Sequence, residues 1–539
     1  MPDAAQSAPE AQRDAATPWW HGASIYQIYP RSFLDSNGDG IGDLNGVTAR
    51  LDHVAALNVD AIWLSPFFTS PMRDFGYDVA DYRGVDPIFG TLDDFDALVA
   101  RAHQLGLKLI IDQVWSHTSD CHAWFRESRQ SRSNAKADWY VWADPKPDGS
   151  PPSNWQSVFG GPAWTWDARR QQYYLHNFLN SQPDLNLHNP VVQDAILDVA
   201  RFWLDRGVDG FRIDAINFGM HDPQLRDNPP AGGNHKRTRP FDFQRRIHNM
   251  SHPDIPLFLE KVAAVVADYP GRFTVAEVGG DDAIGEMHAF TAGRRRLNSA
   301  YGFNFLYADA LTPRLVADAL AEWPETPGTG WPSWAFSNHD APRAASRWHG
   351  VCDHDAYARL IMLLLVALRG NIFLYYGEEL GLTQAEIGFD DLQDPEAIAN
   401  WPLTLGRDGA RTPMPWAADQ ANAGFSSARP WLPLGADHAP RAVDLQLADP
   451  HSMLHWTRAL MALRQQQPAL RRGSARVEMA SGDLLILHRT LGDDRLVCAF
   501  NLGPDPITVD LAIATPLASH GGATARQLPP FSGLIAPCA

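Results

Sequence analysis

Short apolar runs alternate with amphipathic stretches along most of the chain. The apolar runs predict strands at residues 24–29, 60–64, 107–114, 210–213, 273–278, 303–307, 333–337 and 372–376. Apolar residues spaced three and four apart predict helices at residues 46–57, 92–105, 191–206 and 258–267. Eight such units favour an α/β fold, a (β/α)8 TIM barrel. The alternative, a doubly wound open sheet, lacks support because we find no Gly-rich nucleotide loop.

Two stretches interrupt this alternation, and the last part of the chain differs from both. Residues 118–188 hold six tryptophans and a Pro-rich run, which predicts a small domain inserted after strand 3. Residues 381–440 predict a lid-like excursion after strand 8, within the barrel domain of residues 18–117 and 189–469. Residues 470–539 contain short strands at 475–479, 484–489, 496–501 and 507–511, which predict a C-terminal antiparallel β domain. We expect residues 1–17 to form a disordered tail.

Composition narrows the class of protein. The chain has 539 residues, is 45% hydrophobic and carries a formal net charge of −18, so a nucleic acid is a poor partner. The four cysteines are far apart, which indicates free thiols. We expect no signal peptide, and the longest apolar run, residues 360–368, is too short to span a membrane. These features predict a cytoplasmic protein that does not bind membranes. They leave its oligomeric state, monomer or dimer, open.

Polar residues at the ends of the predicted barrel strands are the candidates for chemistry, because barrel active sites lie at the carboxyl ends of strands. Three acids and two histidines occupy such positions: Asp214, Glu277, Asp340, His117 and His339. Any one acid could be a helix cap or a solvated loop residue. Three acids together favour glycoside hydrolysis, which needs one ionised and one protonated carboxyl group. The tryptophan-rich insertions suit the apolar faces of sugars, although such residues are more often core.

Seven segments resemble one known family. Their order and spacing are similar to those of the α-amylase superfamily, glycoside hydrolase family thirteen, and within it to bacterial α-glucosidases and oligo-1,6-glucosidases. The resemblance extends from residue 19 to the C-terminus. The segments are 112–117 (DQVWSH), 182–186 (QPDLN), 207–215 (GVDGFRIDA), 274–278 (TVAEV), 336–340 (FSNHD), 370–380 (GNIFLYYGEEL) and 411–416 (RTPMPW). Family members more often have Asn where this chain has Ser116.

This resemblance implies roles for the candidate residues. Asp214 is expected to be the nucleophile, Glu277 the acid/base, and Asp340 a third carboxylate that grips sugar hydroxyls. Two histidines and one arginine are expected to assist at the same sugar: His117, His339 and Arg212, the last orienting Asp214.

The resemblance also implies a pocket closed at its far end. Asp74 and Tyr77 match the positions that enclose the terminal sugar. Arg407 is expected to pair with Asp74, and Arg411 is the less favoured candidate for that contact. Phe159 and Phe178 are expected to be pocket walls. Such a pocket predicts an exo-acting enzyme that removes one glucose at a time.

Linkage preference is expected to depend on Ala215. Family members that cleave α-1,6 bonds tend to have Val after the nucleophile, whereas Ala or Thr is typical of α-1,4 enzymes. We therefore predict a retaining α-glucosidase acting on small α-glucosides such as maltose, with water or alcohols as acceptors. The alternatives are an oligo-1,6-glucosidase, a sucrose- or trehalose-type isomerase, and a non-catalytic relative like the ectodomains of amino-acid transporter heavy chains. Those ectodomains usually lack the three acids.

Oxygen-bearing residues recur in the loop after the first strand, at Asp35, Asn37, Asp39 and Asp43, with the carbonyl of Ile41 between them. This spacing matches the start of an EF-hand loop, but the Glu expected at position 12 is missing. A turn without metal is the alternative. The family resemblance favours a structural Ca²⁺ or Mg²⁺ with no part in the chemistry, and no organic cofactor is expected.

Overall fold

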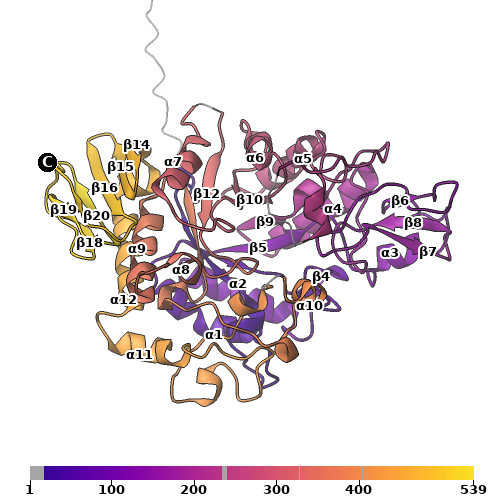
Figure 1. Ribbon diagram of the computed structural model, residues 1–539. Helices are drawn as coiled ribbons and strands as arrows, with labels where there is room; N and C mark the ends of the chain where they lie inside the picture. Colours follow the sequence, from indigo (N-terminus) through magenta and orange to yellow (C-terminus); the bar gives the residue numbers. More distant parts are fainter. Residues whose placement is uncertain (1–16, 234–238, 327, 404–405) are drawn as a thin grey trace, which may run out of the picture.

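The computed structural model describes residues 17–233, 239–326, 328–403 and 406–539, so residues 1–16 of the predicted tail lie outside the described part. Eight parallel strands form a closed barrel, as predicted, and each strand pairs with its neighbours along the chain (Figure 1). The strands are β1 (Ser24–Ile28), β2 (Ala61–Leu64), β5 (Lys108–Val114), β9 (Gly210–Asp214), β10 (Phe273–Val278), β11 (Ser299–Gly302), β12 (Trp331–Ala335) and β13 (Asn371–Tyr375).

Helices surround the barrel and bury its outer face. They are α1 (Leu44–Ala55), α2 (Leu92–Gln104), α4 (Pro190–Asp205), α5 (Ile255–Ala267), α6 (Ala283–Thr291), α7 (Pro313–Ala321), α8 (Ala344–Trp348), α9 (His354–Ala367), α12 (Met453–Gln466) and α13 (Pro468–Arg472). Local sequence sets where they begin. Thr91 and Asp94 form a capping box at the start of α2, and Asn189 caps α4 just before Pro190. The predicted helix at 258–267 begins earlier, at Ile255.

The sixth predicted strand was wrong. Residues 303–307 form a turn, and the strand in that position is β11, directly before them. β11 is short of large apolar residues because its inward side chains make polar contacts: the Ser299 hydroxyl donates to the carbonyl oxygen of Trp331. Phe305 in the turn packs instead on Trp334 and Phe336, at ring-centroid distances of 5.6 and 5.0 Å. A prediction based on hydrophobicity alone therefore placed the sixth strand in the turn that follows β11.

Residues 118–188 lie beside the barrel and contain a small three-stranded antiparallel sheet in the order β6-β8-β7 (Figure 1). The strands of this sheet are β6 (Trp142–Ala143), β7 (Trp164–Asp167) and β8 (Gln172–Leu175), and the helix α3 (Ala123–Ser128) precedes them. A separate small core contains Trp155 and Trp164, whose rings stack.

The C-terminal part forms an antiparallel sheet, as predicted, in the order β14-β15-β16-β20-β18. Its strands are β14 (Ser474–Ser481), β15 (Leu484–Leu491), β16 (Asp494–Asn501), β18 (Ala518–His520) and β20 (Ser532–Pro537), and β17 (Ile507–Thr508) pairs separately with β19 (Gln527–Leu528). The predicted strand at 507–511 is thus shorter. Arg489 on β15 is buried and donates to the carbonyl oxygen of Ala367, the last residue of α9. This bond ties the sheet to the barrel.

Two further segments complete the fold. β3 (Phe68–Thr69) and β4 (Asp81–Val85) pair antiparallel after β2, a hairpin that the pattern did not predict. The segment after β13 holds α10 (Pro395–Asn400), short 3-10 turns and, beyond them, α11 (Val443–Ala448).

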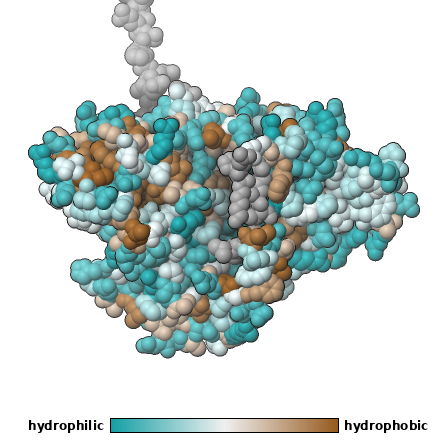
Figure 2. All heavy atoms as spheres, in the orientation of Figure 1, coloured by the Kyte–Doolittle hydropathy of each residue, from teal (hydrophilic) through white to brown (hydrophobic). Residues whose placement is uncertain are grey.

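Within the described ranges, none of the helices has both the length and the hydropathy needed to cross a bilayer. The visible face is mostly hydrophilic (Figure 2).

Candidate active site

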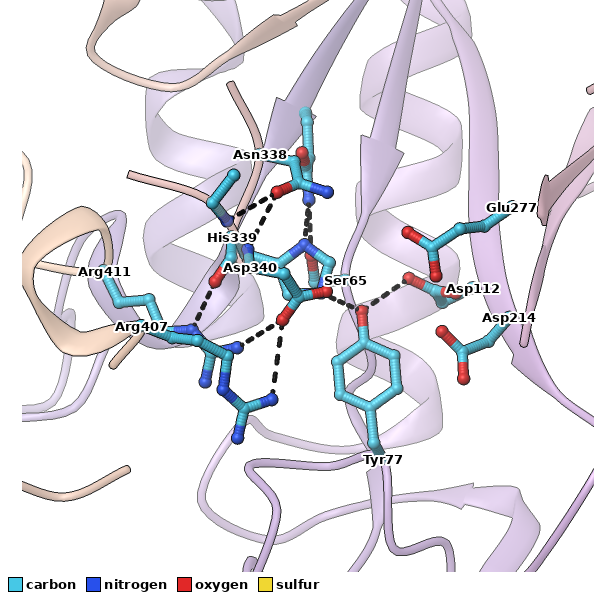
Figure 3. Close-up of polar contacts among 12 residues, drawn as sticks. Ser65, Tyr77, Asp112, Asp214, Glu277, Asn338, His339, Asp340, Arg407 and Arg411 are labelled. Carbon is cyan, nitrogen blue, oxygen red and sulfur yellow. Dashed lines mark hydrogen bonds and ion pairs between the residues drawn. The ribbon is translucent and has the colours of Figure 1, made fainter. Parts of the chain in front are cut away.

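The three predicted carboxylates meet at the carboxyl end of the barrel. Asp214 is the last residue of β9, Glu277 lies one residue before the end of β10, and Asp340 follows β12. In Figure 3, Asp214 and Glu277 lie on one side of Tyr77, and Asp340 lies on the other. Asp214 and Glu277 are each 7% exposed, so both acids are nearly removed from solvent but still reach the barrel mouth.

One arginine holds both inner acids. Arg212 lies two residues before Asp214, so the alternation of β9 puts both side chains on the same side of the strand. Its guanidinium forms ion pairs with Asp214 and, at 2.6 Å, with Glu277. Arg212 Nη1 also lies 2.7 Å from Asp112 Oδ1. Three carboxylates therefore share one buried cation.

Burial governs the protonation of the inner pair. It raises the pKa of Asp214 to about 7, with Arg212 opposing the rise and Asp112 adding to it. Burial likewise raises the pKa of Glu277 to about 7, again against Arg212 and assisted by Asp214. Two close carboxyl groups with raised pKa values tend to hold one proton between them near neutral pH. The site can thus present one ionised and one protonated carboxyl group together.

The pKa of Asp340 is shifted in the opposite direction to those of Asp214 and Glu277. Burial raises its pKa, but His339, Arg411 and Arg407 outweigh burial and hold that pKa well below its usual range. Arg411 Nη2 donates to Asp340 Oδ1 at 2.8 Å, and Arg407 Nη1 lies 3.5 Å from the same oxygen. Asp340 therefore stays ionised.

The ion pair expected between Asp74 and Arg407 is present. Arg407 Nη2 lies 2.9 Å from Asp74 Oδ1, so the structure pairs Asp74 with Arg407, the residue expected for this contact. Asp74 lies in the loop between β3 and β4. Gln182 Nε2 donates to the other oxygen of Asp74 at 3.0 Å, and Asp394 contacts Arg407 at 2.8 Å. The segment after β13 thus reaches across to the hairpin.

Tyr77 lies between the two halves of the site. Its hydroxyl donates to Asp112 Oδ2 at 3.1 Å and also forms a hydrogen bond with His339 Nε2. The rings of Tyr77 and His339 are 5.3 Å apart and nearly parallel, at 6°. A flat, buried aromatic face is suited to contact with the apolar face of a sugar ring.

The remaining predicted residues line one wall. His117 Nε2 lies 3.0 Å from the carbonyl oxygen of Tyr77, and Ser116 Oγ lies 2.9 Å from His117 Nδ1. Ser116 therefore supports His117 despite its departure from the family pattern. The ring of His117 lies 5.0 Å from that of Phe178, which lies 6.0 Å from Phe159. The structure brings all of the predicted sugar-binding residues to one region.

Four residues of this region had no assigned role in the sequence analysis: Asp112, Gln182, Tyr301 and Asp394. Arg411, the alternative partner for Asp74, instead contacts Asp340. Asp112 was detectable, because a charged residue inside the apolar strand at 107–114 needs a buried partner. In β5 it lies in register with Arg212. Tyr301 donates to Glu277 Oε1 at 3.0 Å, but the misplaced sixth strand hid it. Gln182 and Asp394 come from irregular segments whose pattern predicts no neighbours.

Ala215, directly after Asp214, adopts a left-handed backbone conformation with φ of 41°. Residues with a Cβ atom rarely adopt this conformation because it brings Cβ close to the following carbonyl oxygen. The backbone turns sharply at the mouth, and a small side chain fits there with the least strain.

The predicted metal loop folds around its own carboxylates. Asp35 accepts backbone N–H groups from Asn37, Gly38 and Gly40, and Asp39 Oδ1 accepts that of Ile41. Asp43 caps α1 by accepting the N–H of Gly46. The oxygen donors suit a hard cation. Among the described residues, no group of three or more His, Cys, Asp or Glu side chains is placed to hold a metal ion. The metal stays a prediction.

A closed barrel with carboxylates at its carboxyl end defines a barrel enzyme. Residues 27–473 match the family model described as "Alpha amylase, catalytic domain". The chain therefore belongs to the alpha-amylase family of glycoside hydrolases, as the sequence analysis predicted.

Two curated relatives and two solved structures are similar along most of their length. The "Probable alpha-glucosidase" of Rhizobium meliloti is 53% identical over 97% of this chain and 96% of its own. The "Oligo-1,6-glucosidase" of Parageobacillus thermoglucosidasius is 37% identical over 90% of each. A crystal structure of an alpha-glucosyl transfer enzyme has a TM-score of 0.93 at 50% identity, covering 97% of this chain and all of that one. The trehalulose synthase from Pseudomonas mesoacidophila MX-45 has a TM-score of 0.89 at 32% identity, with the same coverage.

Proposed function

We propose that this protein is a retaining, exo-acting α-glucosidase that cleaves terminal α-1,4-linked glucose from small substrates such as maltose. It also transfers the glucosyl group to alcohols or sugars. The observation that carries this proposal is that Asp214 and Glu277 share Arg212, beside the ion pair of Asp74 and Arg407.

In the first step, an oxygen of ionised Asp214 attacks the anomeric carbon while Glu277 gives its proton to the leaving oxygen. The glycosidic bond breaks, and a glucosyl ester of Asp214 forms. In the second step Glu277 takes a proton from water or an alcohol, whose oxygen attacks the same carbon and releases Asp214. Asp340 remains ionised and binds sugar hydroxyls as the ring distorts. The pKa values near 7 of Asp214 and Glu277 support this division of one proton.

The closed pocket end supports exo action. The ion pair of Asp74 and Arg407 would block a longer chain from extending past the terminal sugar. Asp74 can accept hydrogen bonds from hydroxyls of that sugar, and Arg407 can donate hydrogen bonds to them. One glucose is therefore released in each cycle.

The small side chain of Ala215 supports α-1,4 preference, since it leaves room beside the nucleophile for the second sugar. The second candidate is α-1,6 hydrolysis or sugar isomerisation, favoured by the oligo-1,6-glucosidase and trehalulose synthase relatives. The complete set of three carboxylates argues against a non-catalytic relative.

Two accompanying proposals concern the rest of the molecule. The loop of Asp35, Asn37, Asp39, Ile41 and Asp43 would hold a structural Ca²⁺ or Mg²⁺. We also propose a cytoplasmic location, and we leave open whether the protein is a monomer or a dimer.

Product analysis tests the function. The protein is incubated with maltose, with and without a simple alcohol or phenol, and the anomeric form of the products is followed by NMR. We expect α-glucose first, and an α-glucoside when alcohol is present. Initial release of β-glucose would contradict retention. Asp214→Asn should lose both reactions, and a fully active variant would exclude Asp214 as nucleophile.

A further inference from the structure

A line of buried hydrogen bonds runs through the candidate active site from β1 to the shared arginine. It begins at Gln27, on the first barrel strand, and continues through His339, Tyr77 and Asp112 to Arg212. All five side chains are at most 6% exposed. Because none of these groups can exchange a partner freely with water, the position of each proton in the line depends on the neighbouring residue.

Gln27 lies at the start of this line. Its amide nitrogen is 2.9 Å from His339 Nδ1 and 3.2 Å from Ser65 Oγ. Its amide oxygen is buried and finds no hydrogen-bond partner among the described residues. The reversed amide orientation would leave two N–H groups without partners in place of one carbonyl oxygen, which costs more. Gln27 therefore donates to Nδ1, and Nδ1 is an acceptor.

Two neighbours on the other side of the ring require the same tautomer. The single hydroxyl proton of Tyr77 is donated to Asp112, so Tyr77 can only accept from His339 Nε2. Asp340 Oδ2 lies 3.2 Å from Nε2, and a carboxylate would repel a bare nitrogen lone pair. Nε2 must then carry the proton. Burial lowers the pKa of His339 to about 3, so the ring holds only that one proton near neutral pH.

We propose that Gln27 is a positioning residue that fixes His339 as the Nε2–H tautomer. His339 then donates toward Tyr77 and Asp340, and Tyr77 donates to Asp112. The value of this order for turnover rests on the proposed glucosidase function. Without the amide of Gln27, the imidazole could carry its proton on Nδ1. Nε2 would then be an acceptor and could no longer donate a hydrogen bond toward Asp340 and the sugar.

The test combines two substitutions with matched controls. Gln27→Met removes the donor with little change in volume, and Gln27→Glu replaces it with an acceptor that favours Nδ1–H or an imidazolium. Gln113→Met and Gln113→Glu make the same changes at another completely buried glutamine in a barrel strand, whose carbonyl oxygen contacts Trp115. Melting temperatures of all four variants report whether each is folded.

The decisive readout is the ¹⁵N NMR spectrum of histidine-labelled full-length protein, in which the His339 signals are those missing from His339→Asn. We expect the Nε2–H pattern in the wild type and in both Gln113 variants, and its loss in both Gln27 variants. An Nδ1–H pattern in the wild type would overturn the proposal without any Gln27 variant. This spectrum is recorded without substrate. A wild type that shows the Nε2–H pattern but cleaves no α-glucoside would contradict the proposed function and leave the positioning role of Gln27 intact.

Kinetics provides the second readout. Loss of one hydrogen bond that acts mainly in the transition state should lower kcat on maltose about tenfold with KM nearly unchanged. Gln27→Glu should lose more than Gln27→Met, because it favours the wrong tautomer. Folded Gln27 variants that keep both the Nε2–H pattern and the kcat of the Gln113 variants would overturn the proposal.

Discussion

Arg212 Nη1 lies 2.7 Å from Asp112 Oδ1, and neither side chain is exposed to solvent. The contact fixes the guanidinium that also holds Asp214 and Glu277. Asp112 thus sets the electrostatic environment of both proposed catalytic groups without being next to either in sequence. It binds Trp63 and Tyr77 as well, through its other oxygen.

Asp112→Asn should move the acid side of the pH profile. Because the negative charge of Asp112 helps to raise the pKa of Asp214, its removal should lower that pKa. Asp214 would then stay ionised to a lower pH, and the acid limb of kcat/KM should shift down by about one unit. The measurement is kcat/KM on maltose as a function of pH, from about pH 4 to about pH 9.

Asp209→Asn is the matched control for this shift. Asp209 is 1% exposed and pairs with Lys108 and His103 at the opposite end of β9. The variant should keep the acid limb of the wild type. An unmoved limb in folded Asp112→Asn would contradict the electrostatic role of Asp112.

Arg407→Ala should open the closed end of the pocket. The substitution leaves Asp74 and Asp394 buried without their shared cation, and it removes a donor for the terminal sugar. We expect kcat/KM on maltose to fall about a hundredfold or more, because breaking a buried ion pair costs several kcal/mol. Arg429→Ala, in the same segment but with a side chain 88% exposed, should behave like the wild type. Equal activities of the two variants would argue against a role for Arg407.

Ala215→Val should change both linkage preference and stability. A larger side chain beside Asp214 should lower turnover of maltose relative to isomaltose. The left-handed backbone at this position disfavours a β-branched residue, so the melting temperature should fall as well. Ala215→Gly should keep the preference for maltose and melt no lower than the wild type. Faster cleavage of isomaltose than of maltose by the wild type would refute the α-1,4 prediction.

A chelator should destabilise the protein if the loop after β1 holds a divalent cation. We expect EDTA to lower the melting temperature and added Ca²⁺ or Mg²⁺ to restore it, because ligand binding to the native state stabilises it. Asp39→Asn keeps an oxygen for the N–H of Ile41 but removes a charge, so it should melt with less dependence on chelator. An unchanged melt of the wild type in EDTA would exclude the metal.

The sequence by itself determined the barrel and the positions of its main acids. Alternating apolar and amphipathic runs are a strong signal when both faces of the sheet are buried, and seven of the eight predicted strands overlap those observed. Asp214, Glu277 and Asp340 follow from strand ends, since parallel strands bring their carboxyl ends to one face. The failure at residues 303–307 came from β11, whose Tyr301 and Ser299 make polar contacts in the interior.

Only the tertiary structure decided which distant groups pair. Asp74 and Arg407 are 333 residues apart, and Gln27 and His339 are 312 apart, so no local pattern relates them. Their partners are set when the strands close into a ring and the segment after β13 comes to lie against the β3–β4 hairpin. Hydrophobic burial drives that closure without specifying polar partners. The buried polar atoms then need partners within the interior, and this need fixes the pairs and the proton on His339.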